Sequence, residues 1–154
     1  MTPKQHLVKL ALDALQAKHP TWHIDNIPKP VYTANTANGL TKMVIDWIRL
    51  NGGQAERIST TGRYVDNSKV VVNSMGQARK IGTGKYIKGS GTKGSADISA
   101  TIMGRSVKIE VKIGKDKQSD AQKAYQADIE RAMGIYYIAK DFDSFYEWYN
   151  NLTK

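Results

Sequence analysis

The sequence predicts an α/β protein with a mixed β-sheet and flanking helices, built around one central β-hairpin. Two segments, 95–103 and 107–113, alternate apolar and polar residues, as half-buried strands do. Apolar residues recur with the period of an amphipathic helix in four segments: 3–18, 40–50, 119–133 and 142–152. Segment 135–139 is a short apolar run, and a crossover through the preceding helix would place it parallel to 107–113.

The first 38 residues are expected to form a helix and an extended connector that packs on the core. The helix at 3–18 carries an apolar stripe and ends at His19 and Pro20. Residues 21–38 include Pro28 and Pro30 and have little periodicity, which indicates an extended segment. Residues 39–154 are expected to form the main domain, with the whole chain as a single globular unit.

The next segments combine a helix with two candidate strands. The helix at 40–50 stops at Asn51 and the two glycines that follow it. Segments 54–65 and 69–73 have strand-like composition on either side of Asp66 and Asn67. The sequence therefore predicts an antiparallel pair with its turn at Asp66 and Asn67.

A basic, glycine-rich segment precedes the central hairpin. Between residues 76 and 94 there are six glycines and five cations, namely Arg79, Lys80, Lys85, Lys88 and Lys93. Glycine lets the backbone approach a phosphate chain, and lysine neutralises it, so we expect a DNA-contacting loop or hairpin flank. The alternative is a solvent-exposed connection kept soluble by lysine.

The central hairpin places its charged residues on one face. With Gly104 and Arg105 as a two-residue turn, Asp97 lies opposite Lys112. Ser99 then lies opposite Glu110, and Asp97 and Glu110 become diagonal neighbours with Cα atoms about 7–8 Å apart. The apolar residues of both strands share the other face, so register and polarity favour the same pairing.

Two carboxylates and a lysine on one β surface form a candidate metal site for phosphodiester hydrolysis. Magnesium binds through one or two carboxylates, keeps several waters and accepts phosphate oxygens, so Asp97 and Glu110 suit it. Lys112 would orient or deprotonate the nucleophile and stabilise charge in the transition state. A solvated strand face with an ordinary Glu/Lys pair is the alternative interpretation.

The helix at 119–133 begins with a signature of its own. Ser119 and Gln122 fit a capping box, which gives Gln122 a purely structural explanation. The apolar stripe of this helix runs from Ala121 to Met133 and leaves Gln122 and Gln126 on a neighbouring face. That face would look toward the metal site.

Four elements in this order resemble the PD-(D/E)xK nuclease superfamily, and within it the small VRR-NUC and Holliday-junction-resolvase-like enzymes. They are G-S-A-D-I at 94–98, I-E-V-K at 109–112, S-x-x-Q at 119–122, and a turn at Gly134 followed by a strand. The resemblance covers roughly residues 93–148. It implies a restriction-endonuclease-like mixed β-sheet with a catalytic β-hairpin.

The resemblance also implies roles for individual residues. Residues that match Asp97 and Glu110 bind Mg²⁺ or Mn²⁺ in this family, often with the backbone carbonyl of the residue at Val111. The residue at Lys112 helps to position or activate the attacking water, and the one at Gln122 belongs to the active site. The implied product carries a 5′-phosphate.

The chain departs from the family pattern at one point. These enzymes often carry a further glutamate in an early helix, and segment 40–50 offers only Asp46. Asp46 lies off the apolar stripe of its helix, which favours a solvated position, and Glu56 is a comparable alternative. A second metal ion is therefore in doubt.

Composition agrees with a nucleic-acid partner. The formal net charge is +9 and the pI is about 9.7, which favours a polyanionic partner, and the absence of cysteine excludes a disulfide scaffold. Residues 1–19 lack the apolar run of a signal peptide, and no segment is long enough to span a membrane. A soluble cytoplasmic protein is expected.

The sequence thus predicts a metal-dependent DNA endonuclease acting on structured or branched DNA, with a homodimer embracing two strands. Family habit and small size suggest a bacterial cell or a phage-infected host. A catalytically inactive DNA-binding module of the same fold is the first alternative. A structural or assembly protein that docks through its basic face is the second, and RNA as substrate is a lesser variant.

Overall fold

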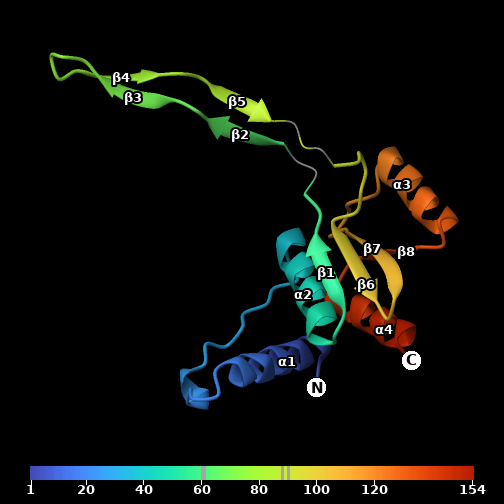
Figure 1. Cartoon of the computed structure of the whole chain (residues 1–154). Helices are drawn as coiled ribbons and strands as arrows, with labels where there is room; N and C mark the ends of the chain where they lie inside the picture. The colour runs from blue at the N-terminus through green and yellow to red at the C-terminus, as the bar shows by residue number, and fades with distance from the viewer. Residues whose placement is uncertain (60–61, 88, 90) are drawn as a thin grey trace. The chain divides into compact units, whose positions relative to one another are not determined.

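The computed structural model describes residues 1–59, 62–87, 89 and 91–154, with Ile24 lacking a described side chain (Figure 1). The chain divides into two compact units. Met1–Ile58 and Gly94–Lys154 form the first, and Ser59–Lys93 form the second. The sequence led us to expect a single globular unit with a boundary at residue 38. In the structure, the chain divides after Ile58 and again before Gly94.

The first unit contains a mixed four-stranded sheet in the order β1-β6-β7-β8. Its strands are Gln54–Arg57 (β1), Ile98–Ile102 (β6), Arg105–Val111 (β7) and Ile135–Ala139 (β8). The first three pair antiparallel, whereas β7 and β8 are parallel, as the crossover interpretation predicted. The fold is therefore α/β with a mixed sheet.

Four helices accompany this sheet: Pro3–Lys18 (α1), Ala37–Leu50 (α2), Asp120–Arg131 (α3) and Phe142–Leu152 (α4), with a 3₁₀ turn at Ile24–Asn26. The predicted bounds of α1, β8 and α4 are confirmed. Helix α2 begins three residues earlier than expected because the hydroxyl of Thr36 caps it, accepting from the Gly39 N–H at 3.1 Å.

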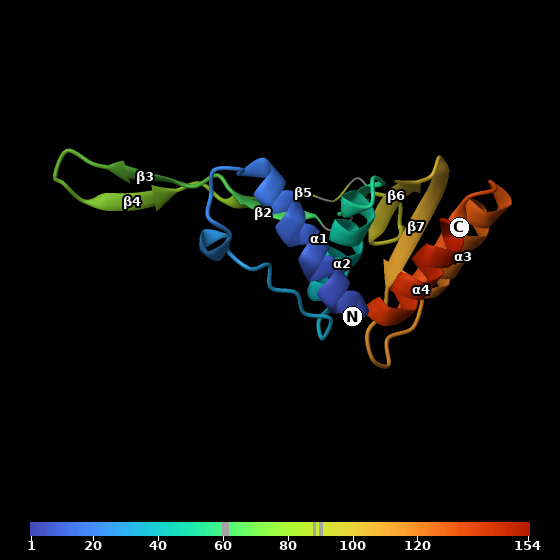
Figure 2. The same ribbon diagram turned by 90° about the horizontal axis from the view of Figure 1, so that it is seen from below.

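The core lies between one face of the sheet and helices α1, α2 and α4. Leu7 and Trp47 pack there with Phe145 and with Ile98 and Ile109 of the central hairpin. Helix α1 also contacts α2, beside which it runs (Figure 2). Helix α3 lies on the other, polar face of the sheet, since Gln122 donates to Glu110 and the ring of Tyr125 contacts that of Tyr136.

The expected apolar stripe of α3 is only partly right. Met133 follows the helix with a positive φ of 62° and is 92% exposed, and no residue of the stripe is fully buried. The half-buried face of α3 instead includes Gln122, Tyr125 and Gln126. Ring contact between Tyr125 and Tyr136 of β8 places this face against the sheet.

The turn of the central hairpin lies one residue earlier than predicted. Met103 and Gly104 form it, with φ values of 49° and 76°, which is the type I′ geometry that fits the twist of the strands. Ser99 therefore lies opposite Lys108, and the expected pairing with Glu110 is wrong. Because the shift changes each partner by two residues, every side chain keeps its predicted face.

The second unit is a two-stranded ribbon formed by Arg63–Asp66 (β2), Lys69–Val72 (β3), Ala78–Ile81 (β4) and Gly84–Ile87 (β5). Strand β2 pairs with β5, and β3 pairs with β4, so the predicted antiparallel pair across Asp66 and Asn67 is wrong. The chain reverses at Asn73 instead, whose side-chain oxygen accepts from the N–H groups of Met75 and Gln77.

Across the described part of the chain, no helix has the length and apolar character required to cross a bilayer.

Candidate active site

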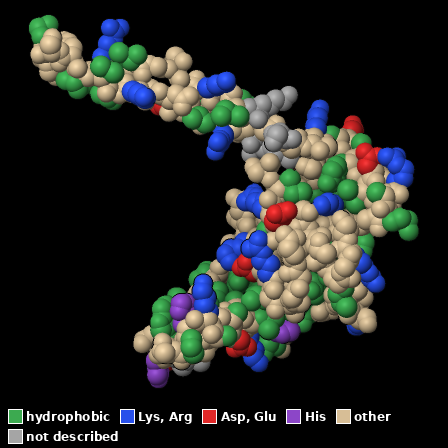
Figure 3. Space-filling model, viewed as in Figure 1, with side chains coloured by type: hydrophobic (Ala, Val, Ile, Leu, Met, Phe, Trp, Pro, Cys, Tyr) green, Lys and Arg blue, Asp and Glu red, His purple; other side chains and the backbone are tan. Residues whose placement is uncertain are grey.

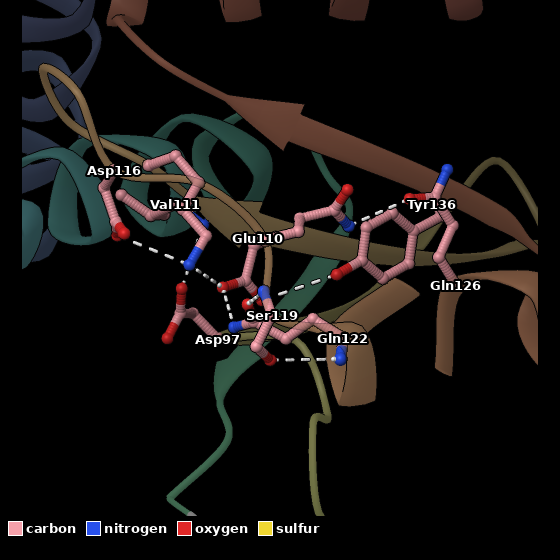
Figure 4. A network of polar contacts seen from close by, with 10 residues as sticks. Asp97, Glu110, Val111, Asp116, Ser119, Gln122, Gln126 and Tyr136 are labelled. Atoms are coloured by element: carbon pink, nitrogen blue, oxygen red, sulfur yellow. Dashed lines mark hydrogen bonds and ion pairs between the residues drawn. The ribbon is translucent and has the colours of Figure 1, made fainter. Parts of the chain in front are cut away.

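Glu110 lies at the centre of a polar network on the face of the sheet opposite the core (Figure 4). Only 2% of its surface is exposed. Its Oε1 atom accepts from the amide of Gln122 and lies 3.1 Å from the Nζ atom of Lys112. Its Oε2 atom accepts from the Tyr136 hydroxyl at 3.4 Å. Strands β7 and β8 and helix α3 therefore all contribute to holding one carboxylate.

Asp97 reaches this network from the residue before β6. Its backbone carbonyl accepts from the Ile58 N–H at 2.8 Å, and its Oδ2 atom accepts from the Val111 N–H at 2.9 Å. The contact of Val111 with Asp97 is thus through its amide, and the metal-ligand role expected of the Val111 carbonyl stays a prediction. The main chain beside Glu110 fixes the Asp97 carboxylate near it.

Gly94 explains how the Asp97 segment comes so close to α3. Its φ is +81°, and an added Cβ would lie 2.4 Å from the carbonyl carbon and oxygen of Ala121 and 2.8 Å from the Gln122 nitrogen. These are backbone atoms that cannot swing aside, so only glycine permits the approach. The first turn of α3 and the Asp97 segment are brought together by this contact.

The electrostatics of the network centre on Glu110. Burial raises the pKa of its carboxyl, and the negative charge of Asp97 raises it further, against the opposing effects of Lys112 and Tyr136. Burial, followed by the charge of Glu110, raises the pKa of Tyr136 to about 12. Two carboxylates are therefore close enough to repel, and a cation is the species that would relieve the repulsion.

Lys112 supplies one positive charge to this place. It is 8% exposed, and its Nζ atom lies 3.1 Å from Glu110 and 3.3 Å from Asp116. Burial alone would lower the pKa of Lys112, but the hydrogen bond and charge of Glu110, followed by those of Asp116, raise it. The ammonium form is thus favoured.

Gln122 makes the predicted capping contact and also contacts Glu110. Its Oε1 atom accepts from the Ser119 N–H at 2.9 Å, and the Ser119 hydroxyl accepts from the Gln122 N–H at 3.3 Å, which completes the predicted capping box. Its amide nitrogen simultaneously donates to Glu110. One side chain therefore starts α3 and orients the buried carboxylate.

Two members of the network were missed by the sequence analysis. Asp116 gave no signal in the sequence, because a spacing of four residues from Lys112 predicts an ion pair only on a helix and this segment is not helical. Tyr136 was treated only as part of a core strand, although its pairing with Lys108 places it on the same face as Glu110.

The two candidates for a third acidic ligand differ in position: Asp46 lies away from the network, whereas Glu56 is on the same face of the sheet as Glu110. Asp46 forms an ion pair with Lys42 and accepts from the Tyr32 hydroxyl at 3.0 Å, so α2 holds it outside the network. Glu56 is exposed on β1 opposite Ser99. Within the described residues, no three or more His, Cys, Asp or Glu side chains gather in a way that could hold a metal ion.

The basic residues predicted to contact DNA lie in or next to the ribbon. Arg79 and Lys80 are on β4, Lys85 is on β5, and Lys93 ends the second unit. Lys80 forms an ion pair with Asp66 at 2.9 Å. Lys88 lies outside the described residues.

Comparison with known proteins adds no family assignment. No protein-family model matches the chain, and no curated protein was found that resembles it. The resemblance to PD-(D/E)xK nucleases therefore stays a prediction that depends on the four sequence elements and on the site geometry.

Proposed function

We propose that this protein is a metal-dependent deoxyribonuclease of the PD-(D/E)xK type. The observation that supports this best is the buried Glu110 carboxylate, which contacts Lys112 and lies near the charge of Asp97. Carboxyl groups whose pKa is shifted by burial and by a neighbouring charge cluster at functional sites. The proposed reaction is endonucleolytic hydrolysis of structured or branched DNA, with a 5′-phosphate product.

Asp97 and Glu110 are the residues that would hold Mg²⁺ or Mn²⁺. The donor set fits a hard cation, because both side chains offer carboxylate oxygens and their mutual repulsion favours a positive ion. When bound, such an ion activates water and neutralises charge on the scissile phosphate. Two carboxylates match a magnesium site that keeps several of its waters.

The protein's own side chains prepare this site in specific ways. Lys112 is paired with two carboxylates and favours its ammonium form, so its proposed role is to stabilise negative charge on the phosphate rather than to accept a proton. Gln122 and Tyr136 donate to opposite oxygens of Glu110 and fix the orientation of its carboxylate. Burial excludes most water from these contacts, which strengthens them.

The test is digestion of labelled linear, nicked, flap and four-way DNA in Mg²⁺ and in Mn²⁺. We expect cleavage by the natural chain, and a loss of about 100-fold or more in Glu110→Gln and in Lys112→Ala. Glu147→Gln and Lys115→Ala make the same charge changes at exposed positions and are expected to retain activity. Full activity of either site variant would overturn the assignment.

A catalytically inactive DNA-binding module of the same fold is the second candidate. It is favoured by the lack of a third acidic ligand among the described residues and by the saturation of Glu110 Oε1 with two internal donors. Such a protein would bind DNA in a salt-dependent manner and leave every substrate of the panel intact in Mn²⁺. Calorimetric titration with Mn²⁺ separates both candidates from an assembly protein without a metal site. DNA as the partner and a homodimer stay predictions.

A further inference from the structure

The ribbon of the second unit is one hairpin with a single register. Arg63 lies opposite Ile87 at its base and Lys69 opposite Ile81 nearer the tip, so six positions separate the two ladders on each strand. No residue is inserted on either side of the break between them. Residues of equal parity therefore share one face along the whole ribbon.

The odd-numbered face of the ribbon carries cations without any acid. Its charged residues are Arg63, Lys69, Arg79 and Lys85. The only acidic residue between 62 and 87, Asp66, is on the even-numbered face, where it forms an ion pair with Lys80. This ion pair joins β2 to β4 across the break and so confirms that the faces are continuous. The ribbon's excess positive charge thus lies on one face.

The even-numbered face is built differently. Tyr64 and Tyr86 lie opposite each other there, and each ring covers a glycine on the other strand. An added Cβ at Gly84 would lie 1.8 Å from the Tyr64 hydroxyl oxygen, and one at Gly62 would lie 2.4 Å from that of Tyr86. These aromatic groups therefore do not interrupt the cationic face.

The four cations are arranged at two levels along the ribbon. Lys69 on β3 is diagonal to Arg79 on β4, and Arg63 on β2 is diagonal to Lys85 on β5. Each level thus offers one cation from each strand, and the levels lie roughly 20 Å apart at about 3.3 Å per residue. Figure 3 shows Lys and Arg side chains spread along the ribbon rather than gathered at its tip.

We propose that the odd-numbered face of this ribbon binds the major groove of double-helical DNA. A two-stranded ribbon fits that groove, and a cation at each edge would reach the phosphates of each strand. Almost every side chain of the four strands is exposed, and within the described residues no carboxylate forms an ion pair with Arg63, Lys69, Arg79 or Lys85. The choice of DNA as the polyanion rests on the proposed function; the choice of face does not.

Arg79 and Lys80 provide a matched pair for the test, since they are adjacent, exposed and on opposite faces. Arg79→Gln and Lys80→Gln remove the same charge from the full chain. Binding to a labelled 20-base-pair duplex is measured by fluorescence anisotropy in EDTA, between 50 and 200 mM salt. The salt slope is the steepness with which the logarithm of the binding constant falls with the logarithm of the salt concentration. We expect Arg79→Gln to reduce this slope by about 0.9. Between 50 and 200 mM salt, the loss of affinity should therefore be about 3.5-fold smaller in the variant than in the natural chain.

Lys80→Gln should leave the slope unchanged, and Arg79→Gln combined with Lys85→Gln should lower it by about 1.8. Equal effects of Arg79→Gln and Lys80→Gln would overturn the proposal, as would equal affinity of the natural chain for a single strand of the same length. Because no divalent cation is present, these results are independent of cleavage. A face-specific slope without cleavage in Mg²⁺ or Mn²⁺ would reject only the nuclease assignment.

Discussion

A buried carboxylate is costly unless its charge is compensated, and Glu110 has almost no exposed surface. Lys112 and Tyr136 lower the pKa of its carboxyl, yet the pKa stays above the usual value because burial and the charge of Asp97 outweigh them. Because its pKa is raised on folding, Glu110 lowers the stability of the folded protein at neutral pH. Functional sites commonly carry such a cost.

The raised pKa of Glu110 predicts a pH-dependent effect of Glu110→Gln in the absence of divalent cations. As pH rises above the ordinary value of 4.5, Glu110 ionises in the unfolded chain first, so the folded state loses stability until its own raised pKa is passed. Glutamine cannot ionise and avoids this loss. We therefore expect the difference in melting temperature, variant minus natural chain, to be larger at pH 7 than at pH 4. Both melting temperatures are measured in EDTA. Glu147→Gln is the exposed control, and an equal difference at both pH values would contradict the prediction.

The two roles of Gln122 can be separated by substitution. Gln122→Glu keeps an oxygen for the Ser119 N–H but loses the amide donor and places a third carboxylate beside Glu110. We expect this variant to keep the cap of α3 and to lose at least about tenfold in cleavage rate. Ser119→Ala removes the cap hydroxyl and should cost about 1 kcal/mol of unfolding free energy while cleavage persists. Urea unfolding and cleavage rates of the two variants separate the two roles. If Gln122→Glu and Ser119→Ala lose cleavage activity equally, Gln122 acts only through the cap.

At the scale of elements, the site is made where the hairpin β6–β7 meets the first turn of α3. The hairpin aligns the two acidic positions, and Gly94 allows α3 to approach them. Both features need a glycine with positive φ, but for different reasons. The surroundings of Gly104 are open, whereas those of Gly94 are filled by the backbone of α3.

Gly94→Ala and Gly104→Ala form a matched pair. Each substitution carries the cost of an L-residue at positive φ, about 1 kcal/mol. Nothing lies within 4 Å of a Cβ at Gly104, so its variant should lose only this amount and stay active. The clash at Gly94 should raise the loss to about 2–4 kcal/mol and displace α3 from Glu110, which would reduce cleavage. Urea unfolding curves and cleavage rates test this, and equal losses in both variants would contradict it.

At the scale of the whole molecule, the buried hydrophobic core, as far as the structure describes the chain, belongs entirely to the first unit. The chain leaves this unit after Ile58 and returns at Gly94, and the Ile58 N–H donates to the Asp97 carbonyl at 2.8 Å. The two chain segments of the first unit that flank the ribbon therefore lie next to each other. In the sequence, the ribbon is an insertion between β1 and β6.

This arrangement predicts that the ribbon can be removed without unfolding the rest. Replacing residues 60–92 with a short Gly/Ser linker should leave the melting temperature of the first unit within about 4 °C, since the described residues of this segment contribute no side chain to the core. Affinity for duplex DNA should fall, while cleavage at low salt should persist. Circular dichroism melts and anisotropy measure both, and loss of cooperative unfolding would contradict the independence of the first unit.

Much of the local structure could be predicted because it depends on short-range sequence patterns. The period-two alternation assigned each residue of the central hairpin to the correct face, and the Ser119 and Gln122 spacing identified the cap of α3. The register was wrong because the turn could be placed at either of two adjacent dipeptides, and only the positive φ at Met103 and Gly104 decides between them. The ribbon pairing failed because the turn was expected at Asp66 and Asn67, whereas the chain reverses at Asn73.

The sequence by itself determined the α/β class, the acidic positions and their shared face, because side-chain period and polarity are local properties of the chain. Only the tertiary structure decided that Tyr136 and Asp116 join Glu110 and Lys112, and that Asp46 does not. It also decided that the ribbon's excess cations lie on one face. These outcomes depend on pairing between distant segments and on the close approach at Gly94, which no local pattern specifies.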